Sequence, residues 1–165
     1  MRVKYEVQLW LNAFLKLIPG IIGCKARNVL MPYKNGKNVR VWEGVQIDSP
    51  SQLIVGENVS INRNCIIHAG GGVEIGKNTL IGPNVIIYSQ NHKYTYPNQL
   101  INQQGYELKK VIIGDNVWIA AGVIILPGVV IGNNTVIGAG SIVTKSIKSS
   151  ALAAGNPIKI IKELN

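Results

Sequence analysis

The segment from Ile113 to Lys145 reads IGDNVWIAAGVIILPGVVIGNNTVIGAGSIVTK and repeats one pattern every six residues. Each repeat has an isoleucine or valine, a smaller or neutral residue two positions earlier and, in most repeats, Asn or Gly three positions later. The same period extends upstream to Leu53, so it organises most of the chain. Its twelve aliphatic positions are Val55, Ile61, Ile67, Ile75, Ile81, Ile87, Ile113, Ile119, Ile125, Ile131, Ile137 and Val143.

A single repeat is a short strand followed by a tight corner. The aliphatic residue and the residue two positions before it point to the same side of an extended backbone. Asn and Gly adopt positive φ angles at low cost, so the chain can turn after each strand. Such repeats bury a continuous apolar core only when they stack as coils. Because an amphipathic helix needs a period of about 3.6 residues, the pattern predicts a parallel β-helix instead.

Three breaks in the period show how many strands make one coil. The first two breaks each add two residues, and the third adds twenty. They lie between Ile47 and Val55, between Ile67 and Ile75, and between Ile87 and Ile113. Since three strands lie between successive breaks, a three-sided coil places all three insertions at one edge. We therefore predict a triangular prism with one long protruding loop, residues 88–110.

The repeat resembles that of the hexapeptide-repeat acyltransferases. The segment Ile113 to Lys145, followed by AAGNPIKIIKE from Ala153 to Glu163, is similar to the C-terminal half of the galactoside, maltose and polysaccharide O-acetyltransferases. The resemblance covers roughly Val39 to Asn165. It implies a left-handed coil, against the usual right-handed crossover rule. It also implies a homotrimer with active sites between neighbouring subunits, and acetyl-CoA as co-substrate with no metal required.

The domain organisation follows from the limits of the repeat. We expect an N-terminal amphipathic helix and lead-in at 1–38, the β-helix at 39–146 and a short C-terminal tail at 147–165. A length of 165 residues suits one domain with its own core. Two cysteines make no disulfide framework, and Cys65, at an inward position, is expected to be a buried thiol. These features favour a cytoplasmic location.

The first 23 residues mix apolar and basic side chains. They lack the small-residue cleavage site of a signal peptide, and their polar residues argue against a transmembrane span. Pro19-Gly20 ends a helical pattern whose apolar residues share one face, namely Val7, Leu11, Phe14, Leu15 and Ile18. Two compatible alternatives stay open for this basic helix. It contacts an anionic membrane at its inner face, or it caps the coil and packs on a neighbouring subunit.

The net charge of +9 raises the question of a polyanionic partner. Aromatic residues are few, at 6%, and no nucleic-acid-binding motif is present, so we expect no nucleic-acid partner. Scattered lysines would also serve a small polyanion such as coenzyme A.

The long loop contains the candidate catalytic residue, His92. A long excursion from a compact domain is usually functional or disordered. The loop sequence S-x-N-H, Ser89 to His92, resembles the active-site loop of polysaccharide and streptogramin acetyltransferases. Transfer of an acyl group from a thioester to a hydroxyl requires a base, and the ordinary pKa of histidine lies near neutrality. We expect His92 to be the general base; no acid that orients it can be identified.

The acceptor and thioester sites are expected on the wall of the coil. Asn62 matches the family's acceptor-pocket asparagine when His92 is matched to its catalytic histidine. Trp118, one residue before an inward position, points outward and matches a tryptophan that lines the acceptor and pantetheine tunnel. The resemblance places the thioester oxygen near the main-chain N–H of Ala121. His68 has no matching role and is expected at the surface or at an interface.

The coenzyme A site is expected towards the C-terminus. Ala139 keeps the wall low beside a pantetheine arm, and the family pattern puts Thr144 and Lys145 beside coenzyme A. Lys159 and Lys162 match basic positions that meet the nucleotide phosphates, where arginine is common in relatives. Lysine keeps the charge and loses bidentate geometry, so a solvated basic tail is the alternative for these two residues.

The predicted function is direct transfer of acetyl from acetyl-CoA to a sugar hydroxyl in cell-surface polysaccharide biosynthesis, with His92 as general base. One alternative is a related enzyme with another acceptor, such as an antibiotic, serine or an amino sugar nucleotide. A non-catalytic trimeric scaffold is another. A γ-class carbonic anhydrase shares the coil but coordinates zinc with three histidines, and this chain has two.

Overall fold

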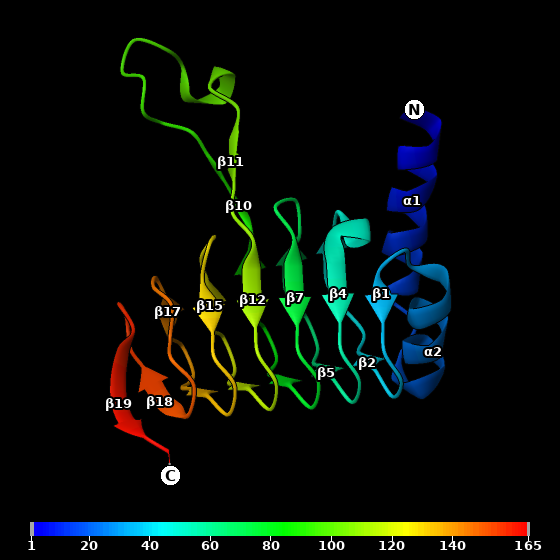
Figure 1. Cartoon of the computed structure of the whole chain (residues 1–165). Helices are drawn as coiled ribbons and strands as arrows, with labels where there is room; N and C mark the ends of the chain where they lie inside the picture. The colour runs from blue at the N-terminus through cyan, green and yellow to red at the C-terminus, as the bar shows by residue number, and fades with distance from the viewer. Residues whose placement is uncertain (1, 165) are drawn as a thin grey trace.

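The computed structural model describes residues 2–164, and the side chains of residues 6–164. The chain forms a solenoid of about six turns with the parallel strands that the period predicts, and its left hand is the one that the resemblance implies. Figure 1 shows its parallel strands side by side along the prism. The first face contains β1 (Lys34–Asn35), β4 (Leu53–Val55), β7 (Val73–Ile75), β12 (Val111–Ile113) and β15 (Val130–Ile131). The second face contains β2 (Arg40–Val41), β5 (Ser60–Ile61), β8 (Leu80–Ile81), β13 (Trp118–Ile119), β16 (Val136–Ile137), β18 (Ala151–Ala154) and β19 (Lys159–Glu163). The third face contains β3 (Gln46–Asp48), β6 (Ile66–His68), β9 (Ile86–Tyr88), β14 (Ile124–Ile125) and β17 (Ile142–Val143).

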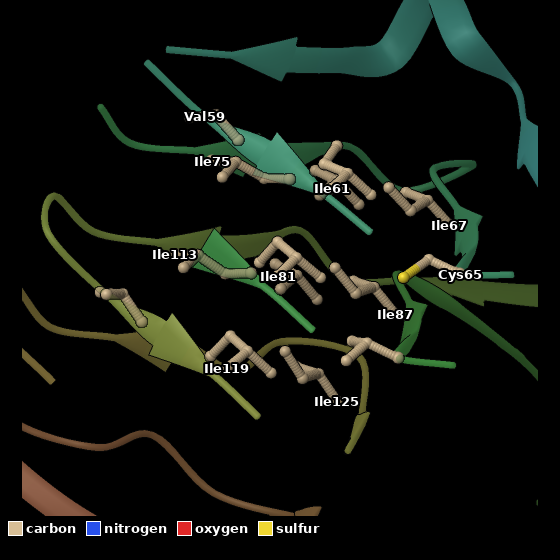
Figure 2. Packing of buried hydrophobic residues seen from close by; sticks show 14 of the residues in the cluster. Val59, Ile61, Cys65, Ile67, Ile75, Ile81, Ile87, Ile113, Ile119 and Ile125 are labelled. Atoms are coloured by element: carbon tan, nitrogen blue, oxygen red, sulfur yellow. The ribbon is translucent and has the colours of Figure 1, made fainter. Parts of the chain in front are cut away.

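The core is the column of inward side chains that the period predicts. All twelve aliphatic positions, and the twelve residues two positions before them, are at most 2% exposed. Figure 2 shows isoleucines of successive coils stacked on one another, such as Ile61 on Ile81 on Ile119. Each buried isoleucine contributes about 1.5–3 kcal/mol to folding. Inward polar residues satisfy their hydroxyls locally, since Thr79 donates to the Gly114 carbonyl at 2.9 Å.

The corners have the backbone conformation that the Asn and Gly positions predict. Asn84 has φ of 57° and Gly122 has φ of 67°, both in the left-handed region. Nine of the ten predicted corner residues adopt this conformation, and Gly70 is the exception. Two residues are inserted at that corner, so the left-handed position moves to Gly72, with φ of 91°.

All three insertions leave the edge between the third and first faces, which we call the loop edge. The first insertion is the short 3-10 helix η1 (Pro50–Gln52), the second is the turn at Gly70–Gly72, and the third is the long loop. The prediction of a single insertion-bearing edge is confirmed. The coils also extend past residues 39 and 146, because β1 already pairs with β4, and β18 pairs with β16.

The long loop is a structured arm that projects from the prism (Figure 1). Strands β10 (Gln90–His92) and β11 (Tyr106–Leu108) pair antiparallel, and η2 (Ile101–Gln103) lies between them in sequence. The predicted long protruding loop is present, and it contains two paired strands that the sequence did not predict. The arm, residues 90–108, has no buried residue. Backbone hydrogen bonds rather than apolar burial define its shape.

Two helices, rather than the single predicted one, cover the N-terminal end of the prism. They are α1 (Arg2–Leu15) and α2 (Gly20–Leu30). Leu15 is buried against the core, whereas Val7 and Phe14 are 61% and 67% exposed. The apolar face predicted for the helix is thus only partly covered. Within the described residues, no helix is long and apolar enough to cross a membrane.

The buried Arg27 ties the helices to the first coil. Its guanidinium donates to the carbonyls of Leu15 at 2.5 Å, Ile18 at 3.0 Å and Val41 at 2.7 Å. These carbonyls belong to the end of α1, to the α1–α2 link and to β2. Buried polar groups are stable when they are hydrogen-bonded, so this residue fixes the position of α1 against the prism.

Candidate active site

His92 is held at the base of the arm, beside the loop edge. It is the last residue of β10 and lies directly across from Tyr106 of β11. The two rings are 4.6 Å apart between centroids and tilted by 41°. The imidazole is exposed, as a base that receives a proton from an incoming substrate must be. A cavity of about 400 Å³ lies here, lined by His68, Tyr88, Gln90, Asn91, His92, Tyr106, Leu126 and Pro127.

No carboxylate orients His92 within the part of the chain that the structure describes. Glu107 lies across from Asn91, one residue away in register, and its carboxylate contacts Lys109 at 3.0 Å. Neighbouring residues of a strand point to opposite sides, so Glu107 faces away from the imidazole. The Tyr106 ring is therefore the main neighbour that positions His92.

His68 lies in the same cavity and is a functional candidate that the sequence left unassigned. It occupies the outward position after Ile67, in register with Asp48 below and Tyr88 above. Its ring stacks on Tyr88 with centroids 5.9 Å apart, and its Nε2 atom is 3.9 Å from Asp48 Oδ2. The sequence signal was the polar or aromatic residue that follows the inward position in three successive coils at the loop edge.

Asn62, Trp118 and Ala121 meet in a second cavity, of about 320 Å³, on another part of the prism. This cavity spans the second face and the edge between the second and third faces. Trp118 is 53% exposed and pairs in register with Leu80 and Val136. The residues that line this second cavity are Ser60, Asn62, Leu80, Ile81, Gly82, Pro83, Trp118, Ala120 and Ala121.

The surface of the coil beside Trp118 is formed in part by small side chains, and the main-chain N–H of Ala121 is available there as a donor. A side chain at Gly82 would place its Cβ 2.8 Å from the Ala121 nitrogen, so only glycine allows the coils this approach. The Ala121 N–H donates to no acceptor among residues 6–164. Its carbonyl accepts from the Gly140 N–H at 2.9 Å, which places Ala139 on the same edge one coil further along.

The four remaining predicted residues lie towards the C-terminal end. Thr144 and Lys145 are exposed at the loop edge, directly after β17. Lys159 and Lys162 are exposed on β19, a strand that the sequence did not predict, paired antiparallel with β18. The ammonium groups of Lys145, Lys159 and Lys162 are therefore accessible to solvent.

One acidic residue of β19 is already paired. The Lys148 ammonium hydrogen-bonds the Glu163 carboxylate and lowers its pKa. Glu163 is thus matched by a cation of the same chain. No such ion pair is formed by Lys159 or Lys162 within the described residues.

One chain does not bring the two cavities together. The cavity at His92 and the cavity at Trp118 share no lining residue. No cluster of three or more His, Cys, Asp or Glu side chains suited to a metal ion occurs in residues 2–164. The candidate base and the candidate thioester site therefore lie on separate parts of a single prism.

Comparison with known proteins identifies the repeat. A family model described as bacterial transferase hexapeptide (six repeats) matches residues 110–145, and one described as hexapeptide repeat of succinyl-transferase matches residues 52–89. The chain is 42% identical over 130 residues to the galactoside O-acetyltransferase of Escherichia coli (strain K12), covering 79% of this chain and 63% of that protein. It spans between 59% and 67% of the length of the first curated relatives it matches.

Solved structures give the same assignment. A maltose O-acetyltransferase from Clostridium difficile 630 is 35% identical with a TM-score of 0.84, covering 97% of this chain and 86% of that one. A galactoside acetyltransferase in complex with coenzyme A is 34% identical with a TM-score of 0.86, covering 96% and 79%. Because repeat models, sequence relatives and solved structures agree, this chain belongs to the hexapeptide-repeat family of acyltransferases.

Proposed function

We propose that this protein is an acetyl-CoA-dependent O-acetyltransferase that acts on a sugar hydroxyl. The observation that carries the proposal is an exposed histidine, His92, held in a paired strand against Tyr106 on this β-helix. A relative of the same fold, 34% identical, was solved with coenzyme A, and its name gives a galactoside as its acceptor. The geometry and the relatives thus support the same class of reaction.

The proposed reaction is a direct transfer. His92 takes the proton of the sugar hydroxyl while the hydroxyl oxygen attacks the acetyl carbonyl carbon. The Ala121 N–H donates to the carbonyl oxygen as negative charge develops on it. The carbon–sulfur bond breaks, the sugar keeps the acetyl group as an ester, and the proton on His92 passes to the departing thiolate. No covalent enzyme intermediate is required.

The donor site in this proposal lies along Trp118 and the low edge of Ala121 and Ala139. Thr144 and Lys145 lie beside the donor, and Lys159 and Lys162 meet its phosphates. The exposure of these lysines and the net charge of +9 support a polyanionic donor. Asn62 belongs to the acceptor side of the same cavity as Trp118.

We further propose a homotrimer in which neighbouring subunits complete each site. Support comes from the separation of the two cavities, since neither contains both a base and a low wall for the donor. Closed cyclic symmetry is the usual solution when one surface must meet a different surface of an identical chain. The runner-up functions are the same chemistry on an antibiotic, serine or an amino sugar nucleotide, and a non-catalytic trimeric scaffold.

The setting we propose is cell-surface polysaccharide biosynthesis in the cytoplasm, with α1 touching the inner face of the membrane. Val7, Trp10 and Phe14 follow one another at helical spacing and are between 61% and 75% exposed. Their apolar stripe, on a basic N-terminal region, suits an anionic bilayer surface. Sedimentation with anionic vesicles tests this part: Trp10→Ser together with Phe14→Ser should abolish the binding that wild type shows.

The test of the catalytic proposal needs no knowledge of the acceptor at first. Titration calorimetry with acetyl-CoA should show saturable binding near one site per chain. The Trp118→Ala, Lys145→Ala double variant should lose it, whereas Lys37→Ala, an exposed lysine far from the site, should not. His92→Ala should keep the binding and lose transfer to sugars by about 10²–10⁴-fold. A folded trimer without acetyl-CoA binding would favour the scaffold instead.

A further inference from the structure

A groove leads away from His92 towards the N-terminal helix. In Figure 1, α1 and the arm project from the prism in the same direction. A cavity of about 810 Å³ lies along this edge, and it shares His68, Gln90 and Tyr106 with the cavity at His92. We call the larger cavity the α1 groove. It is lined by Gln8, Leu9, Asn12, Pro32, Ile47, Asp48, Ser49, Pro50, Ser51, Gln52, His68, Gly70, Gln90 and Tyr106.

Amide and hydroxyl side chains, which hydrogen-bond neutral hydroxyl groups, make up much of the lining of the α1 groove. Gln8 and Asn12 lie one helical turn apart on α1, and the Gln8 amide donates to Asn12 Oδ1 at 2.8 Å. Each amide keeps further donors and acceptors for a ligand. Serine hydroxyls of the η1 turn and the Gln90 amide add to this lining. The Tyr106 ring offers an apolar face at the junction with the His92 cavity.

His68, at the junction of the two cavities, also has unused hydrogen-bonding capacity. Its Nδ1 atom is buried and has no hydrogen-bond partner among the residues that the structure describes. Its Nε2 atom lies 3.9 Å from Asp48 Oδ2, too far for a direct hydrogen bond. The imidazole therefore lies at the meeting point of the two cavities without a strong partner of its own.

The charge of the α1 groove discriminates between acceptor classes. The chain has a net charge of +9, yet among the described side chains, those of residues 6–164, neither lysine nor arginine lines this groove. Asp48 is the one carboxylate, and His68 the one titratable base, among these described lining residues. A nucleoside diphosphate needs cations or clustered N–H donors around its phosphates. The groove suits a neutral saccharide and disfavours a nucleotide-linked sugar.

We propose that the α1 groove binds the further units of a neutral oligosaccharide whose reacting hydroxyl lies at His92. This inference rests on the proposed acetyl transfer and names its acceptor class. The unit that reacts occupies the smaller cavity, between Tyr106 and His68. The next units run along Asp48 and the η1 turn to Gln8 and Asn12 on α1. A monosaccharide fills only the first of these positions.

The experiment measures coenzyme A release from acetyl-CoA with neutral acceptors of increasing length. The panel contains mono-, di-, tri- and tetrasaccharides of glucose, of galactose and of N-acetylglucosamine. In at least one series KM should fall about tenfold or more from mono- to tetrasaccharide. Asn12→Ala together with Gln52→Ala should raise KM for the tetrasaccharide about 3–30-fold and leave the monosaccharide constants unchanged, as expected for the loss of one or two hydrogen bonds. Asn98→Ala, an exposed amide at the tip of the arm, is the matched control.

The outcomes separate this inference from the function on which it rests. Transfer with the same KM for every length, or with no effect of the double variant, would overturn the extended site and keep the acetyltransferase. Acetyl-CoA binding without transfer to any sugar would contradict the sugar acceptor itself, and the inference with it. Efficient transfer to a dTDP-sugar, in preference to every neutral glycan, would identify the acceptor as a nucleotide sugar and refute the argument from charge.

Discussion

Cys65 occupies an inward position that other repeats fill with Thr79 or Ser141. Its Sγ atom lies 3.1 Å from the carbonyl oxygen of Gly82, a corner residue of the next coil. The Thr79 hydroxyl makes the equivalent contact with the carbonyl oxygen of Gly114, at 2.9 Å. This inward position therefore accommodates a small side chain that donates a hydrogen bond to a corner carbonyl of the next coil. Burial raises the pKa of the Cys65 thiol from 9.0 to about 11.

This shift predicts a loss of stability at alkaline pH. The unfolded chain releases the thiol proton above about pH 9, while the folded chain holds it to about pH 11. The contribution of Cys65 is complete below pH 9, falls between pH 9 and 11, and amounts to about 3 kcal/mol. Burial also raises the pKa of Tyr33 above its usual value of 10.0, so Tyr33 adds a loss of the same sign above pH 10.

The measurement is the free energy of unfolding in denaturant at pH 8, 9 and 10, at one protein concentration. Cys65→Ser, whose hydroxyl can donate to the Gly82 carbonyl, should fold and should show a shallower decrease between pH 8 and 10. Cys24→Ser provides the comparison, since Cys24 is a buried residue of α2 and lies outside the coil. Equal pH dependence of wild type and Cys65→Ser would show that this thiol is not the titrating group.

At the scale of elements, the corners are the parts that the sequence determines most locally. Asn84 has φ of 57°, and the structure gives its side chain no hydrogen-bond partner among residues 6–164. Its contribution is therefore conformational. Asn84→Ala should lower the free energy of unfolding by about 1–2 kcal/mol, because alanine adopts the left-handed region less readily than asparagine does. Asn84→Gly should stay within about 0.5 kcal/mol of wild type in the same denaturation experiment. Equal losses for both variants would indicate a packing role instead.

The arm is the element that determines where the base lies. Since the His92 ring rests on Tyr106, Tyr106→Ala should lower kcat for acetyl transfer about 3–10-fold through looser positioning. The dissociation constant for acetyl-CoA should not change. Tyr106→Phe keeps the ring and should retain most of the rate. Tyr94→Ala removes an aromatic side chain that is still more exposed, from the outer arm, and should have no effect on kcat. A decrease in kcat with Tyr106→Phe as large as with Tyr106→Ala would assign the effect to the hydroxyl group.

At the scale of the whole molecule, the separate cavities predict complementation between subunits. His92→Ala and Trp118→Ala should each be inactive as homotrimers. When the two variants are co-expressed and mixed trimers form, about a quarter of the sites should combine an intact His92 with an intact Trp118 from a neighbour. Activity should return to about that fraction of wild type. Separately purified variants, mixed without subunit exchange, are the control. Mixed trimers without activity would place both residues in one chain's own site.

The sequence alone determines the prism. Side-chain direction alternates along a strand, and positive φ is cheap only for a few residue types, so a period of six predicts the inward and corner positions with no knowledge of distant contacts. The same arithmetic predicts that the insertions share one edge, and sheet topology confirms it. These features are local, because each coil repeats the geometry of the one before it.

Other elements depend on contacts between residues far apart in the sequence, which no local sequence pattern predicts. The arm has no buried apolar face, so no alternating hydrophobic pattern marks β10 and β11 in the sequence. Strand β19 forms by pairing with the edge of β18, a contact that its own sequence does not indicate. Helix α2 contains Gly23, a poor helix former, at a place where any Cβ would lie 2.0 Å from the Ile18 carbonyl oxygen. The hydrogen bonds of its own Arg27 to α1, the α1–α2 link and β2, rather than propensity, hold that helix.

For the candidate site, the sequence identifies residue types, and the tertiary structure decides which of them are neighbours. Asp48, His68 and Tyr88 are twenty residues apart in sequence and adjacent in space, because one coil with its insertion has that length. The same winding separates His92 from Trp118 and opens a groove between α1 and the arm. The sequence shows which side chains could react or bind, but a site also depends on the distances between them. In a β-helix those distances are set by the number of residues in each turn.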